Sequence, residues 1–162
     1  MNPNRRILLA APLLALLAAC ATQPTSSPES LADTIAHNPD LSTLNGLVVR
    51  AGLTDTFKAP GPYTVFAPTN EAFKAVPAKT MDELAHDPAR LKAVLTYHVL
   101  SGKLMAADVR NTSSKTAEGA SISLARAGEF VTVEDAMVQT SDIVATNGVV
   151  HTVDRVLMPP RH

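Results

Sequence analysis

The amino-acid sequence predicts an α+β fold, a small antiparallel β-sandwich with helices packed on one side and end. Apolar residues recur at helical spacing from residue 30 to residue 98, whereas from about Val99 onward they alternate with the period of a strand. Helices that come first and strands that dominate later favour an α+β chain. No internal repeat or heptad pattern interrupts this order.

Two helices are expected before residue 53. Ser30, with Asp33 three residues later, has the spacing of a capping box, and Asn38-Pro39 ends this first helix. Asp40 is expected to cap the second helix, which ends at Gly52, where a left-handed residue is needed. The apolar stripe of the second helix consists of Leu41, Leu44, Leu47, Val48 and Ala51.

The stretch of residues 63–73 changes from strand to helix at one proline. Its first residues, from Tyr63 to Phe66, are β-branched or aromatic on both faces, which is typical of a strand covered on two sides. Pro68 cannot donate to a ladder and ends the strand. Thr69 or Asn70 is then expected to cap a short helix.

Two more helices and several strands follow. Thr80 and Glu83 have capping-box spacing for a short helix, and Asp87-Pro88 is the start expected of another. The acidic pair Glu134-Asp135 predicts a turn, and Asn147-Gly148 predicts a tight hairpin turn before the last strand. Strand candidates are centred on Ile122 and Leu124, on Val131 and Val133, and on Ile143 to Ala145.

Residues 1–19 have the pattern of an export signal. Arg5 and Arg6 precede an apolar run that is shorter than the roughly 20 residues needed to span a bilayer. The sequence from Leu17 to Cys20 resembles a bacterial lipobox. We therefore expect residues 1–19 to be a lipoprotein signal peptide and Cys20 to be the site of lipid attachment. An ordinary signal-peptidase site, with Cys20 as a bystander, is the alternative.

The next ten positions predict a flexible tether. Residues 20–29 contain two prolines and no large aliphatic or aromatic side chain, so they cannot offset the entropy lost on ordering. Residues 30–159 are then expected to form a single domain. Ala21 resembles the second residue of lipoproteins that Gram-negative bacteria sort to the outer membrane rather than the inner one.

Charge and composition argue against several function classes. The chain has 14 Lys and Arg, of which 12 remain once Arg5 and Arg6 are removed with the signal peptide, and it has 15 Asp and Glu. The resulting net charge of −3 does not attract nucleic acid. None of the five histidines forms an i,i+4 pair and the single cysteine has no partner, so we expect no metal site and no cofactor. Nucleophile-elbow, phosphate-loop and dinucleotide motifs are absent too, so we expect the protein not to be an enzyme.

Three stretches of the chain resemble the fasciclin domain family. They are residues 63–73, the pair Tyr97-His98, and residues 147–157, which occur in the family's order within residues 30–159. The resemblance implies a fasciclin domain, whose fold agrees with the α+β prediction. It also implies a structural signature that consists of Phe66, Thr69, Asn70, Phe73, Asn147, Gly148 and His151.

The same resemblance implies four candidate partner-binding residues. Tyr97 and His98 match a tyrosine-histidine pair that is implicated in integrin binding in animal matrix proteins of the family. Asp142 and Ile143 match an aspartate-isoleucine pair that is implicated in integrin recognition. The alternative for His98 is a partly buried residue with hydrogen-bonded ring nitrogens, and the alternative for Ile143 is a place in the core.

His151 lies between valines in the last predicted strand. A polar ring in such a strand costs on the order of 1 to 3 kcal/mol if it is left without hydrogen bonds. We therefore expect His151 to be a buried structural residue, with partners in the turn of residues 68–71, where Thr69 and Asn70 lie.

The sequence thus predicts an envelope-anchored lipoprotein that acts as an adhesion or surface-interaction module. Its expected partners are the membrane, through the lipid on Cys20, and a surface protein or polysaccharide. A small-ligand or lipid carrier is the alternative, and it would need an apolar pocket between helices and sheet. A catalytic domain would need a buried polar cleft with converging side chains.

Overall fold

The fold is described by a computed structural model that covers residues 29–160. The predicted signal peptide, Cys20 and all but the last residue of the predicted tether lie outside the described residues. The helices are α1 (Leu31–His37), α2 (Ser42–Arg50), α3 (Thr54–Lys58), α4 (Asn70–Lys74), α5 (Ala78–His86) and α6 (Pro88–Tyr97), with single 3-10 turns at η1 (Pro39–Leu41) and η2 (Ala106–Asp108).

The strands form one hydrogen-bonded ladder in the order β2-β1-β7-β6-β5-β4-β3. An isolated bridge between Leu100 and Thr116 brings the two ends of this ladder together, so the sheet folds back on itself. The strands are β1 (Tyr63–Pro68), β2 (Val99–Ser101), β3 (Thr112–Lys115), β4 (Ser121–Ala127), β5 (Phe130–Val133), β6 (Ala136–Ala145) and β7 (Gly148–Val153).

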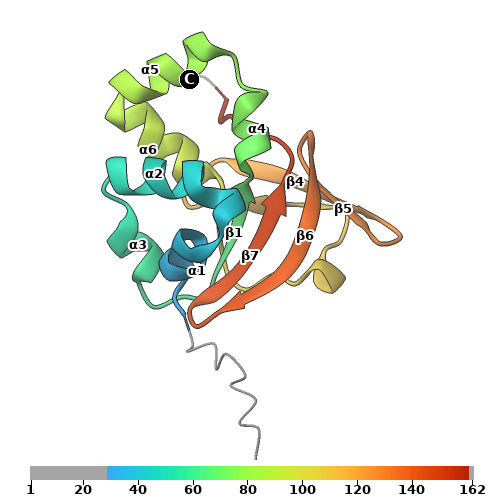
Figure 1. The fold of residues 1–162 in the computed structure, drawn as a ribbon. Helices are drawn as coiled ribbons and strands as arrows, with labels where there is room; N and C mark the ends of the chain where they lie inside the picture. Colours follow the sequence, from blue (N-terminus) through green and yellow to red (C-terminus); the bar gives the residue numbers. More distant parts are fainter. Residues whose placement is uncertain (1–28, 161–162) are drawn as a thin grey trace, which may run out of the picture.

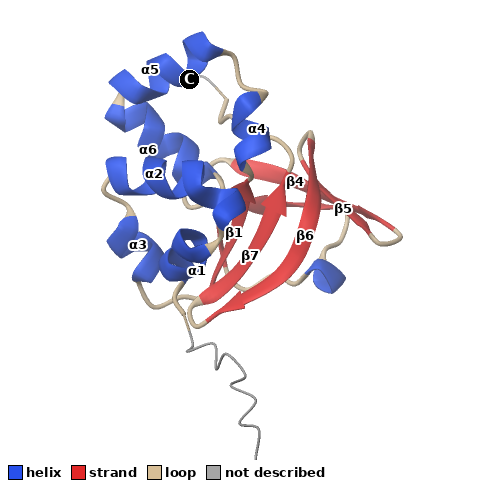
Figure 2. Cartoon of the chain, viewed as in Figure 1, coloured by secondary structure: helices blue, strands red, loops and turns tan. Residues whose placement is uncertain are grey.

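The helices lie on one side and at one end of the strands, which confirms the α+β prediction (Figure 2). Neighbouring strands pair antiparallel with one exception, the parallel pair of β1 and β7. A parallel pair needs a crossover connection, and here most of the domain forms it, because β1 precedes and β7 follows every other strand.

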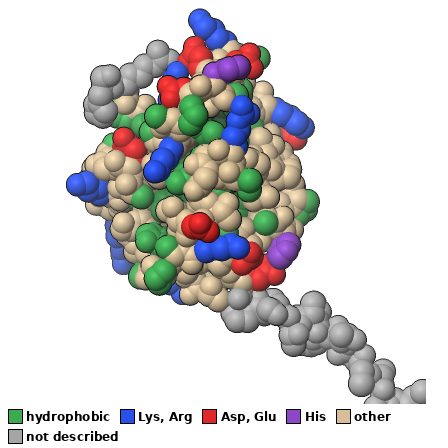
Figure 3. Space-filling model, turned by 90° about the vertical axis from the view of Figure 1, so that its left-hand side faces the viewer, with side chains coloured by type: hydrophobic (Ala, Val, Ile, Leu, Met, Phe, Trp, Pro, Cys, Tyr) green, Lys and Arg blue, Asp and Glu red, His purple; other side chains and the backbone are tan. Residues whose placement is uncertain are grey.

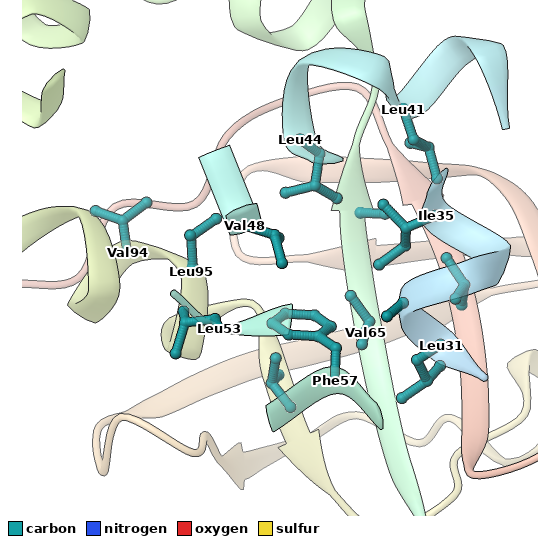
Figure 4. Close-up of a cluster of buried hydrophobic side chains, with 14 of the residues drawn as sticks. Leu31, Ile35, Leu41, Leu44, Val48, Leu53, Phe57, Val65, Val94 and Leu95 are labelled. Carbon is teal, nitrogen blue, oxygen red and sulfur yellow. The ribbon is translucent and has the colours of Figure 1, made fainter. Parts of the chain in front are cut away.

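Strand β1 is buried on both faces, as its apolar sequence predicts. Val65 and Ala67 face a core shared with the helices, whereas Phe66, between them, faces the core enclosed by the folded sheet. We call the first the helical core, and Figure 4 shows it: Leu31, Ile35, Leu41, Leu44, Val48, Leu53, Phe57, Val65, Val94 and Leu95. We call the second the sheet core, and its largest members are Phe66, Tyr97, Leu100, Ile122, Leu124 and Leu157.

Several helix ends agree with their local sequence signals. The side chain of Ser30 accepts a hydrogen bond from the backbone N–H of Asp33, and that of Asp87 from the N–H of Arg90, so both cap the helices expected of them. Thr69 rather than Asn70 caps α4. Gly52 has a φ of 68°, as expected of the residue after α2.

Two predicted caps are wrong. Helix α5 begins at Ala78, directly after Pro77, so Thr80 lies inside the helix and does not cap it. Asp40 lies within η1, whose N-terminus is capped instead by Asn38. In both cases a proline fixes the backbone earlier than the polar residue does, and the first turn starts there.

The hairpin of β6 and β7 contains Asn147-Gly148 but does not use it as a turn with positive φ. Ala145 pairs with Gly148, so the two turn residues are Thr146 and Asn147, and neither has a positive φ. Gly148 is instead the first residue of β7. A Cβ atom added to it would lie 2.0 Å from the carbonyl oxygen of Tyr63 in β1. Glycine is required there because the two parallel strands approach so closely.

This contact predicts opposite effects for two glycine substitutions. Gly148→Ala should lower the free energy of unfolding by about 3 kcal/mol, since β1 and β7 must separate to make room for the methyl group. Gly46→Ala should raise it by up to about 1 kcal/mol, because Gly46 lies inside α2 and a Cβ there meets no atom within 4 Å. Urea unfolding followed by circular dichroism measures both changes. Equal stability of the wild type and Gly148→Ala would show that the strands are not in contact here.

Candidate functional site

Asn147 joins three separate elements through its side-chain amide. Its Oδ1 accepts a hydrogen bond of 2.8 Å from the backbone N–H of Leu31 at the start of α1. Its Nδ2 donates to the carbonyl oxygens of Phe57 and Ala59, at 2.9 and 2.8 Å, at the end of α3. The β6–β7 turn is thereby fastened to the helices, so the role of Asn147 is structural.

Asn70 likewise connects separate elements through its side-chain amide, at the other end of β1. Its Oδ1 accepts from the backbone N–H of Thr43 at 3.0 Å, and its Nδ2 donates to the carbonyl oxygen of Pro39 at 3.0 Å. These bonds connect α4 to the junction of η1 and α2. Phe73, in the same helix, is buried against the helical core. Asn70 and Phe73, two residues of the predicted structural signature, therefore support the fold.

His98 is buried, with 2% of its surface exposed, and both of its ring nitrogens have partners. Nδ1 donates to the carbonyl oxygen of Val94 at 2.7 Å, and Nε2 accepts from the backbone N–H of Leu157 at 2.9 Å. This pattern requires the neutral ring with its proton on Nδ1. Burial lowers the pKa of His98 to about 4, against a smaller opposing effect of the bond to Val94.

Tyr97, next to His98, is also buried, with 4% of its surface exposed in the sheet core. Burial raises the pKa of its phenol, and the carboxylates of Glu134 and Glu118 act in the same direction. Neither side chain of the pair is presented to a partner. The prediction that Tyr97 and His98 contact a partner is therefore at odds with the fold, because their side chains fill the core rather than the surface.

His151 is buried and hydrogen-bonded, but its partners are not the predicted ones. Nε2 donates to the carbonyl oxygen of Leu104 at 2.6 Å, and Nδ1 accepts from the backbone N–H of Asp142 at 3.1 Å. Its ring stacks on Phe66 with centroids 5.6 Å apart. The register explains the difference: His151 lies beside Phe66, whereas the predicted partner turn lies beyond the paired end of β1 at Pro68.

The neutral state of His151 is also set by its surroundings. Burial lowers its pKa, and the bond to Leu104 and the carboxylate of Asp142 oppose that shift. The Oδ1 atom of Asp142 lies 3.9 Å from Nδ1, but Nδ1 already accepts the Asp142 backbone N–H. The contact is therefore a hydrogen-bonded arrangement of a neutral ring beside a carboxylate rather than an ion pair.

Asp142 and Ile143 lie at an irregularity of β6. The register between β6 and β7 shifts between Thr140 and Ile143, and Asp142 takes a φ of 59°. The Asp142 side chain is 36% exposed, and its Oδ1 accepts from the backbone N–H of Ala106 at 2.8 Å. Ile143 is half-buried against the helical core. Of the four predicted contact residues, Asp142 is the one with a substantially accessible polar group.

Sequence reasoning missed the loop that these side chains hold. Thr64, which is buried in β1, donates to the carbonyl oxygen of Gly102 at 2.7 Å and accepts from the N–H of Leu104 at 2.8 Å. Together with His151 and Asp142, it fastens residues 102–106 across three strands. A threonine that alternates with apolar residues in a strand carries no signal of this role.

Metal-ligating side chains do not gather in the described part of the chain, and its hollows are open. Within residues 29–160 no group of three or more His, Cys, Asp and Glu side chains lies close enough to hold a metal ion. In the same range every buried side-chain nitrogen or oxygen has a hydrogen-bond partner. Two hollows in the described domain are grooves open to solvent, of about 940 and 690 Å³. No helix among the described residues is both long and apolar enough to cross a bilayer.

Comparison with known proteins identifies relatives across most of the chain. The model of the fasciclin domain matches residues 39–159. Protein sll1483 of Synechocystis sp. is 38% identical over 138 residues, which are 84% of this chain and 77% of that protein. Cell surface glycolipoprotein MPB83 of Mycobacterium bovis is 36% identical over 137 residues, 82% of this chain and 61% of that protein.

A solved structure shares the fold. It is the FAS1 domain pair of the insect cell adhesion molecule fasciclin I, with a TM-score of 0.61 and 21% sequence identity. The match covers 73% of this chain and 45% of the domain pair. At this level of identity the likeness concerns the fold alone.

The buried neutral histidines predict that acid destabilises the fold. Above about pH 6.5, His98 is neutral in both the folded and the unfolded chain, and its contribution to stability is fully present. As the pH falls towards 4, the unfolded chain takes up a proton that the folded chain does not. The free energy of unfolding should therefore fall by about 3 kcal/mol through His98 over this interval, and His151 acts in the same direction.

Urea unfolding at a series of pH values measures this loss. His98→Gln should lower stability at neutral pH and make the decline towards acid shallower, because one titrating group is removed. His86→Gln is the matched control, since His86 is exposed on α5. An unchanged acid decline in His98→Gln would show that His98 is not held neutral by the fold.

Proposed function

Because this chain belongs to the fasciclin domain family, we propose that it acts as an adhesion or surface-interaction module, held at the cell envelope by a lipid on Cys20. The observation that carries the proposal is the complete internal pairing of buried polar side chains within residues 29–160. An enzyme needs a buried cleft with converging polar side chains that are free to meet a substrate. In the described domain the buried polar side chains are all engaged by the protein itself, and the two hollows are grooves open to solvent, which favours a function at the surface.

The anchor is supported by the sequence and by one relative. Cys20 is the single cysteine of the chain and directly follows the apolar run at the lipobox-like position. The related MPB83 is named a cell surface glycolipoprotein. We propose that Cys20 carries the lipid, and that the outer membrane holds the protein if the source is Gram-negative.

The geometry of the domain shows which end an N-terminal anchor would hold. The backbone oxygen of Glu29 accepts from the N–H of Thr146 at 2.8 Å, so the described chain enters beside the β6–β7 turn. Helices α4, α5 and α6 and the last described residues lie at the opposite end (Figure 1). A tether on Cys20 would therefore join the domain at the end with the β6–β7 turn, far from α4 to α6.

The surface favours a protein partner over a polysaccharide. Sugar rings are commonly bound by stacking on exposed aromatic rings, but the chain has no Trp, and Phe57, Phe66, Phe73 and Tyr97 are buried. Phe130, with 65% exposure, is the one large aromatic among the exposed hydrophobic residues of the described domain. On the helical face acidic, basic and apolar side chains are interspersed, without a single-sign patch for a polyanion (Figure 3).

Cys20→Ser should abolish lipid attachment. Labelled palmitate should enter the wild-type protein and the control Ala21→Ser, but not Cys20→Ser, because only the thiol of Cys20 can carry the diacylglycerol. The wild type should be recovered in the membrane fraction after cell breakage. Recovery of unlabelled wild-type protein from periplasm or medium would contradict the anchor.

The surface role of Asp142 can be tested separately. Affinity capture of proteins from envelope extracts should be weaker for Asp142→Ala than for the wild type, since the partly exposed carboxylate is removed. Asp135→Ala is the matched control, because Asp135 is exposed in the neighbouring β5–β6 turn. Equal capture by the wild type and both variants would show that Asp142 is not part of the contact. Circular dichroism verifies that both variants are folded.

A further inference from the structure

The larger groove lies at the end of the domain that is remote from the tether. Its walls are the end of α4 with the α4–α5 connection, helix α6, and the C-terminal segment, which we define as residues 154–160. It encloses about 940 Å³ and is open to solvent. These elements lie together at the α4 to α6 end of the molecule (Figure 1).

The C-terminal segment presents unpaired backbone in this groove. It forms neither helix nor ladder after Asp154, and of the peptide N–H groups from Arg155 to Met158 only that of Leu157 has a partner among the described residues, the Nε2 atom of His98. Met158 precedes a proline and is restricted to extended backbone. Val156 and Met158, on either side of Leu157, both line the groove, and their N–H groups have no partner among the described residues.

Unpaired backbone N–H groups can bind an extended peptide by pairing with its carbonyl oxygens. Backbone N–H and C=O groups are strong hydrogen-bonding groups, and an unpaired extended edge accepts a further strand from a partner. The lining of the groove includes small or aliphatic side chains, among them Ala72, Ala75, Val76 and Ala93. Small side chains leave room for apolar side chains of an incoming strand.

The lining argues against other classes of ligand. It contains no aromatic residue on which a sugar ring could stack. Its charges nearly balance, with Arg90 and Arg155 against Asp87, Glu118 and Asp154, so it does not attract a polyanion or an anionic lipid surface. Most of these charges are already engaged: Arg90 contacts Glu83, and the three acids each accept a backbone N–H.

We infer that the groove binds an extended, mainly apolar peptide segment of a partner protein, which pairs its backbone with Val156 and Met158. The inference rests on the proposed surface-interaction function and names the place and chemistry of the contact. The site lies away from the tether, so a partner on another surface can reach it. It is distinct from Asp142, which lies in β6 outside this groove.

The test begins with the full chain purified in detergent and a library of random peptides displayed on phage. Selected peptides, made synthetically, should bind the wild type and share apolar residues at alternate positions. Ala75→Trp fills the groove from an exposed position and should weaken binding by about tenfold or more. Ala89→Trp is the matched control, because Ala89 is exposed on α6 and does not line the groove, and it should change binding by less than about twofold.

A second measurement locates the contact. Amide hydrogen exchange of Val156 and Met158 should slow when a selected peptide is bound, whereas exchange of Leu157, already bonded to His98, should change little. Selection of no peptide, equal binding by Ala75→Trp and the wild type, or unchanged exchange at Val156 and Met158 would each overturn the inference. So would binding of a polysaccharide that Ala75→Trp abolishes.

The outcomes also separate this inference from the general proposal. If Ala75→Trp captures the same envelope proteins as the wild type while Asp142→Ala does not, the surface function stands and the groove is not its site. If neither substitution affects capture and Cys20→Ser changes neither labelling nor location, the general proposal fails instead.

Discussion

The close parallel contact between β1 and β7 is the constraint on which the rest of the fold depends. At Tyr63 and Gly148 the backbones approach so closely that only a residue without a Cβ fits. The pair divides the interior, because alternate residues of β1 face the helical core and the sheet core. Both cores form against this pair of strands, and Asn147 and Asn70 then fasten the helices to its two ends.

The two buried histidines connect separate backbone segments inside the domain through hydrogen bonds. Each imidazole spans two segments that have no other backbone pairing with one another: His98 connects α6 to the C-terminal segment, and His151 connects the loop after β2 to β6. A neutral ring can donate from one nitrogen and accept at the other, which a protonated ring cannot. The same bonds that stabilise these segments at neutral pH therefore make them sensitive to acid.

The two ends of the described chain lie at opposite ends of the domain. The chain enters the domain beside the β6–β7 turn and the C-terminal segment ends among α4, α5 and α6 (Figure 1). His98 holds the C-terminal segment through the N–H of Leu157, whereas the N–H groups of Val156 and Met158 have no partner among the described residues. His98, which resembles a binding determinant in sequence, thus holds the segment that forms one wall of the proposed groove.

The sequence by itself determined the α+β class, the double burial of β1, and the helix caps at Ser30, Thr69 or Asn70, and Asp87, because these follow from neighbouring residues. It also marked Asn147, Gly148 and His151 as structural, through their resemblance to the family signature. Only the tertiary structure decided what each of them does. Gly148 is needed for the approach of Tyr63, 85 positions earlier in the chain, rather than for a turn. The partners of His151 and the bulge at Asp142 depend on the β1–β7 and β6–β7 registers. The groove is assembled from α4, α6 and the C-terminal segment, and local sequence patterns carry no information about contacts between residues so far apart.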